Sequence, residues 1–128
     1  MNARIWRHRA GLAIAVITIA TGAIQIVTPA FVLGTIGAES TAATRHLFGT
    51  VGMFMALFGG ALLHALQRPV ERRIVVLWAA LQKFGAVAAV GLGVARGLFS
   101  PLALGVAGFD LLSGLVIIWL WIDLSASP

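Results

Sequence analysis

The sequence contains no cysteine and no tyrosine, and only 10% of its 128 residues are charged. Without cysteine the chain cannot form disulfides, thiolate metal sites or a thiol redox centre. This excludes the quinone-linked disulfide enzymes, which are also small helical membrane proteins. A soluble domain carries about 25% charged residues. The shortage of charge therefore excludes an ordinary soluble domain.

Apolar residues make up 60% of the chain, and the mean hydropathy is +1.02. A soluble chain of this size exposes roughly a third of its unfolded surface to water even when folded, so it could not hide so many apolar side chains. Lipid is the consistent solvent. The composition and length predict one all-α transmembrane domain over residues 1–128, in the cell (inner) membrane, with the lipid bilayer as its first partner.

Four apolar runs are long enough to cross a bilayer, for which about 20 residues suffice. They predict helices over about residues 9–28, 44–66, 70–95 and 101–121, packed as a four-helix bundle. Residues 29–43 are expected to form an interfacial segment, because Pro29 stops the first helix and Gly34 and Gly37 break the apolar run. Whether residues 30–38 re-enter the membrane stays open.

The N-terminus resembles a signal peptide, with Arg4, Arg7 and Arg9 before an apolar run from Gly11 to Val27. No small-x-small cleavage site closes this run, and it is long enough for a span. We therefore expect a retained first helix, with cleavage as the alternative.

The arginines predict the orientation. Six of them (Arg4, Arg7, Arg9, Arg68, Arg72 and Arg73) fall on one side of the predicted bundle and two (Arg45 and Arg96) on the other. Cytoplasmic segments carry the excess of positive charge, so both termini are expected in the cytoplasm. The net charge of +5 is explained in the same way, together with anionic headgroups, and no nucleic-acid partner is expected.

In lipid, helices associate through close packing of small residues and through polar contacts. Each run carries such residues three or four positions apart, on one face. The stripes are Gly11, Ala15, Thr18, Gly22 and Gln25 in the first run; Gly49, Gly52, Ala56, Gly60 and His64 in the second; Ala79, Gln82, Ala86, Ala89 and Gly93 in the third; and Ala103, Ala107, Asp110, Gly114, Ile117 and Trp121 in the fourth. We expect these stripes to form the helix interfaces.

Lys83 and Asp110 are the charges that interrupt the third and fourth runs. At 1.5 Å per residue in a core of about 30 Å, Lys83 lies about 13 to 14 Å and Asp110 about 16 to 17 Å from the cytoplasmic edge. Consecutive antiparallel helices are usually neighbours. The depths predict a buried Lys83–Asp110 ion pair, with Gln82 as its polar companion and with Gln25 and His64 as supporting polar residues.

Two roles are open for this pair. It can be a structural bond that fixes how two helices dock, or part of a proton or ion pathway, or a counter-charge for a polar substrate group. The structural role is favoured because no second carboxylate continues a relay path in these runs.

No catalytic, metal or cofactor motif is present. His46 and His64 share one helix face but are expected near opposite membrane surfaces, about 27 Å apart at helix rise. A monomer therefore lacks a second histidine on another helix for haem, and we expect no cofactor.

About 130 residues in four spans with a basic N-terminus resemble the small bacterial membrane proteins grouped as DoxX-like. The resemblance is one of architecture and implies no functional residue. Small multidrug transporters share the size, but their essential glutamate lies in the first helix, where this chain has Gln25 and Thr18.

The sequence favours a structural or accessory membrane protein over an enzyme. It leaves open a homo-oligomeric small transporter or channel subunit that uses the buried pair, and assembly as a homo-oligomer or within a larger complex. A membrane enzyme acting on lipids or quinones is the least favoured alternative, because His46, His64 and Glu39 do not cluster in depth.

Overall fold

The computed structural model describes residues 3–68 and 72–125, which form helices and connecting turns with no strand in these ranges. The helices are α1 (Ala3–Val27), α2 (Pro29–Thr35), α3 (Ala42–Gln67), α4 (Arg72–Ala95) and α5 (Ala103–Ser125). Of the described helices, α1, α3, α4 and α5 are long and apolar enough to cross a membrane. The all-α class and the four predicted membrane-spanning candidates are thus confirmed.

The long helices extend beyond their apolar runs. α1 begins at Ala3 instead of residue 9, and α5 runs over Ala103–Ser125 instead of 101–121. Polar residues end a membrane-compatible run, but they do not end a helix, so the helix continues past the last apolar turn. The predicted start of the third run, residue 70, lies outside the described residues.

The segment between the first two long helices is itself partly helical. α2 is 7 residues long, so it measures only about 10 Å, far less than a span of about 30 Å. The helix ends at Thr35, Ile36 is its C-cap, and the next residue, Gly37, has a φ of +66°. The Gly37 N–H donates to the Gly34 carbonyl, and the Ala38 N–H donates to the Leu33 carbonyl. This pattern is the Schellman motif, in which glycine supplies the left-handed residue.

A reciprocal cap starts α3. The Thr41 hydroxyl accepts from the Thr44 N–H at 3.1 Å, and the Thr41 N–H donates to the Thr44 hydroxyl at 2.8 Å. Two N–H groups that have no partner inside the helix are satisfied in this way.

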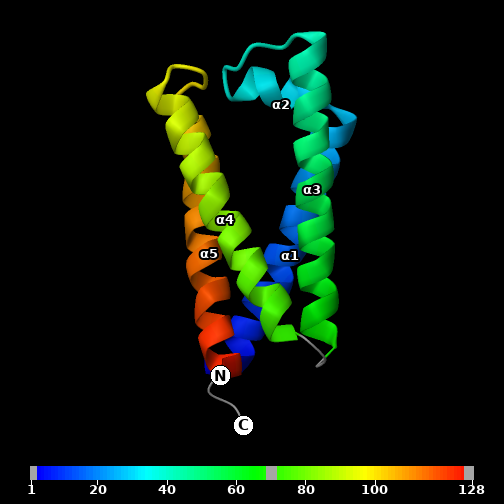
Figure 1. Ribbon diagram of the computed structural model, residues 1–128, viewed down its shortest axis with the longest axis vertical. Helices are drawn as coiled ribbons and strands as arrows, with labels where there is room; N and C mark the ends of the chain where they lie inside the picture. The colour runs from blue at the N-terminus through cyan, green and yellow to red at the C-terminus, as the bar shows by residue number, and fades with distance from the viewer. Residues whose placement is uncertain (1–2, 69–71, 126–128) are drawn as a thin grey trace.

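The four long helices form two antiparallel pairs, α1 with α3 and α4 with α5 (Figure 1). Contacts between the pairs, from α1 to α5 and from α3 to α4, are fewer. Figure 1 shows that the pairs approach each other at the end that holds both termini and separate toward α2. The buried apolar cluster includes Ile14, Leu66, Val76, Ile117 and Leu120, so all four long helices contribute to it.

α1 and α3 approach to backbone contact. A Cβ added at Gly52 would lie 2.6 Å from both Gln25 Cβ and the Gly22 carbonyl oxygen. One at Gly59 would lie 2.9 Å from the Ala15 carbonyl oxygen. Only glycine fits at such distances, which is how transmembrane helices gain packing contacts in lipid.

Burial supports the predicted stripes unevenly. All residues of the first stripe are buried, and in the last stripe every residue is buried except Trp121, which is partly exposed. The second stripe is corrected: Gly59 contacts α1, whereas a Cβ at Gly60 would meet nothing within 4 Å, and His64 is exposed. Spacings of three and four cannot distinguish two adjacent glycines, and the geometry of α1 decides between them.

At the α2 end, loops rather than helices join the two pairs. The Ser100 N–H, in the α4–α5 turn, donates to the Ile36 carbonyl at 2.8 Å. An open apolar cavity of about 330 Å³ lies beside this contact. Its lining includes Leu33, Phe48 and Phe99, with Glu39 and Thr44 as polar members.

Candidate functional site

Lys83 of α4 and Asp110 of α5 form a buried ion pair. Lys83 Nζ donates to Asp110 Oδ1 at 2.7 Å, and the two residues are only 2% and 4% exposed. This distance is typical of a charge-assisted hydrogen bond between an ammonium and a carboxylate. The structure thus brings together the two charges whose depths matched in the sequence.

Small residues on α5 create the space for this pair. Gly114 lies one turn after Asp110, and a Cβ there would be 2.9 Å from the Phe84 ring and 3.3 Å from Lys83 Cβ. Ser113, also on α5, is buried at 3% exposure. The Phe109 ring centroid lies 5.4 Å from Lys83 Nζ, within the range of a cation–π interaction. The ammonium therefore has both a carboxylate and an aromatic face beside it.

Residues of α1 and α3 also lie close to the Lys83–Asp110 ion pair. A cavity of about 10 Å³ is lined by Lys83 and Gln82 of α4, by Thr18 of α1, and by apolar residues of α3 and α5. Gln82, the predicted companion of the pair, is therefore close to Lys83, although no hydrogen bond joins them. Thr18 is 3% exposed and is a polar neighbour that the sequence did not assign to the pair.

The other two predicted supporting residues lie elsewhere. Gln25 is buried where α1 meets α3 at Gly52, two turns along α1 from Thr18. His64 is exposed near the end of α3. Neither residue lines the cavity beside Lys83.

A second ion pair, which the sequence did not predict, joins Arg7 of α1 to Asp123 of α5. The Arg7 guanidinium also lies over the Trp119 ring, 4.4 Å from its centroid. The Arg73 guanidinium, on α4, lies 5.2 Å from the centroid of the Trp121 ring of α5. The sequence predicted that Arg7 and Arg73 lie on the same membrane side, but it gave neither arginine a partner.

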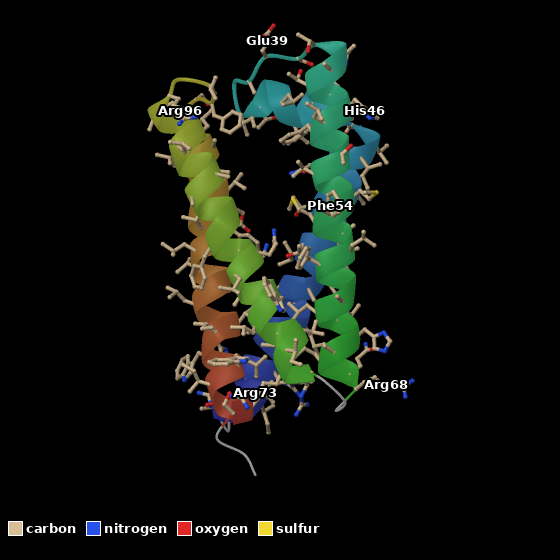
Figure 2. All side chains as sticks on the ribbon, viewed as in Figure 1. Glu39, His46, Phe54, Arg68, Arg73 and Arg96 are labelled. Carbon is tan, nitrogen blue, oxygen red and sulfur yellow. The ribbon has the colours of Figure 1, made fainter. Side chains whose placement is uncertain are left out.

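Charged residues occupy the two ends of the molecule. Figure 2 places Arg68 and Arg73 at the end with the termini, and His46, Glu39 and Arg96 at the end with α2. His46 and His64 are both exposed on α3. In the described part of the chain, no three His, Asp or Glu side chains gather where a metal ion could bind.

The site holds two opposite charges away from solvent, with the Thr18 hydroxyl, the Gln82 amide and the Phe109 ring nearby. Comparison of the chain with protein-family models, with curated proteins and with solved structures finds no match. The functional argument therefore rests on the geometry of these residues.

Proposed function

We propose that this chain is a structural or accessory protein of the cell (inner) membrane, in which the Lys83–Asp110 pair fixes the docking of α4 on α5. The observation that supports this proposal is the enclosed 2.7 Å contact between the two charges. A lone charge at a helix centre costs about 2.5 to 3.5 kcal/mol on insertion scales. Pairing reduces this cost only in the correct register of the two helices, so the pair selects that register.

A small bundle with both termini in the cytoplasm belongs to the same proposal. Its support is the sorting of arginines, since Arg68 and Arg73 lie at the end with the termini (Figure 2). The proposal keeps the architectural resemblance to DoxX-like proteins, and the partner is the bilayer itself, a second copy or a larger membrane complex.

The test is a double-mutant cycle of Lys83→Met and Asp110→Leu, read by thermal unfolding of the purified protein in detergent. Each single change leaves one buried charge without its partner, which costs about 3 to 5 kcal/mol for buried pairs. We expect both single variants to be destabilised and the double variant to recover to within about 1 kcal/mol of the parent, because apolar replacements of a buried pair are often neutral. Single variants as stable as the parent, with no coupling, would contradict the proposal.

The alternative is a homo-oligomeric transporter or channel subunit. The observation that favours it is the position of Lys83, which lines a cavity between the two helix pairs in addition to contacting α5. Proton and ion flux into liposomes distinguishes the two functions. The accessory role requires the double variant to behave as the parent does, whereas a pathway through the pair requires parental flux that the folded double variant has lost.

A further inference from the structure

The small cavity beside Lys83 lies where all four long helices meet. Thr18 belongs to α1, Gly59 to α3, Gln82 to α4 and Ile117 to α5, and each of them lines it. Most of the lining is apolar, so the three polar side chains (Thr18, Gln82 and Lys83) determine what the cavity can bind.

Thr18 differs from other threonines of the long helices. The hydroxyl of Thr21 donates to the Ile17 carbonyl at 2.7 Å, and that of Thr50 donates to the His46 carbonyl at 3.1 Å, one turn back in each case. The Thr18 hydroxyl is buried and has no hydrogen-bond partner in the structure. A buried hydroxyl almost always has a partner, which can be protein or ordered water.

Lys83 also has unused donors. An ammonium group has three N–H bonds, and the structure assigns one of them, to Asp110 Oδ1. The remaining donors and the Thr18 hydroxyl belong to residues that line the same cavity.

The size of the cavity fits one small ligand. Its volume is about 10 Å³, and a buried water needs roughly 10 to 15 Å³ and two to four polar partners. We propose that this cavity binds a single water molecule, which accepts from the Lys83 ammonium and hydrogen-bonds to the Thr18 hydroxyl, with the Gln82 amide as the third polar neighbour.

This water would give the charged pair a partner on α1. The pair alone joins α4 to α5, which belong to one helix pair; the water extends the hydrogen-bonded network across to the other. The proposal is independent of the accessory function, because a transporter subunit with the same cavity would bind the same water.

Lys83 is the only lysine in the chain, which makes a direct test practical. Protein labelled with ¹⁵N at the lysine ζ position gives one side-chain resonance. In bilayers of deuterated lipid, solid-state NMR would measure magnetisation transfer from water protons to this nitrogen. We expect transfer in the parent protein, retention in Thr18→Ser, which keeps the hydroxyl, and loss in Thr18→Val, which has a similar shape without it.

Thr21→Val is the matched control, because it removes a threonine hydroxyl from the same helix but from outside the cavity. It should leave the transfer unchanged. No transfer in the parent would show a dry cavity and overturn the proposal without any variant. Equal transfer in a folded Thr18→Val protein would also overturn it, because Lys83 would then contact water by a wider route.

Discussion

At the scale of residues, two ion pairs hold different parts of the molecule. Lys83–Asp110 lies within the α4–α5 pair, whereas Arg7–Asp123 joins α1 to α5 where the two helix pairs meet. Arg7 adds a stacked contact with Trp119. A planar guanidinium can pair with a carboxylate and stack on an aromatic ring together, which the compact lysine ammonium does less well. Arg7 therefore contributes to the junction between the pairs, and not only to the positive charge of the N-terminus.

Replacing Arg7 with leucine should destabilise the protein. The change leaves Asp123 without this arginine and removes the contact over Trp119, and we expect a loss of about 1 to 3 kcal/mol, since the site is only partly enclosed. Thermal unfolding in detergent would measure it.

Arg9→Leu is the matched control, because Arg9 is an exposed arginine of the same helix. A surface change of this kind should stay within about 0.5 kcal/mol of the parent. Equal losses in both variants would mean that overall charge, and not the Arg7 contacts, stabilises this end of the protein.

At the scale of elements, α1 and α3 pack closely because the glycines at their contact have no side chain. Gly52 faces the Gly22 carbonyl so closely that an added Cβ cannot be accommodated without moving a backbone. The Cβ atom of Gln25 lies at the same contact. In lipid this close approach supplies van der Waals contacts that the hydrophobic effect does not supply.

Gly52→Ala should therefore separate α1 from α3, with a loss of about 1 to 3 kcal/mol from overpacking. Gly60→Ala, on the same helix, has open space around it and should be neutral or stabilising by up to about 1 kcal/mol, because alanine is the better helix former. Thermal unfolding of the two variants side by side makes the comparison. A Gly52→Ala protein as stable as the Gly60→Ala protein would be inconsistent with backbone contact between the helices.

At the scale of the whole molecule, the two ends differ in charge. Arg7, Arg9, Arg68, Arg72 and Arg73 belong to helix ends near the termini, while Arg45 and Arg96 belong to the α2 end. The described carboxylates at the first end are limited to Asp123, which binds Arg7. This asymmetry supports the proposal that the end with the termini faces the cytoplasm.

Cysteine labelling would test this orientation without background, since the chain has no cysteine of its own. A membrane-impermeant maleimide applied to intact cells should label Glu39→Cys, beside α2. It should label Arg68→Cys, at the end of α3, only after the membrane is permeabilised. Labelling in the opposite order would reverse the proposed topology.

The sequence predicted a contact correctly where two residues lie at similar depths along consecutive membrane-spanning runs. Lys83 and Asp110 interrupt apolar runs at similar depths in consecutive helices, and antiparallel neighbours must bring such residues together. The four candidate spans followed from length and composition in the same way. The functional role of the pair stays a prediction, because the same contact fits both a structural bond and a step in an ion pathway.

Three features could not be read from the sequence. The Arg7–Asp123 pair was missed because the predicted helices began at 9 and ended at 121, which placed both residues outside them. The choice of Gly59 over Gly60 depends on how far α3 is rotated toward α1, a rotation that spacing alone leaves undetermined. Thr18 was recognised as part of a stripe, but its neighbour Lys83 lies in the other helix pair.

The pairing of α4 with α5 also bears on how the chain enters the membrane during synthesis. Lys83 and Asp110 are 27 residues apart and lie in one helical hairpin, so their contact can form as soon as α5 leaves the translocon. Neither charge then needs a partner from α1 or α3, which precede this hairpin in the chain. The first hairpin, α1 with α3, has no charge at its centre and can insert unaided. The second hairpin, α4 with α5, neutralises its own charges as it inserts. Each half of the protein is therefore suited to membrane integration in the order of translation.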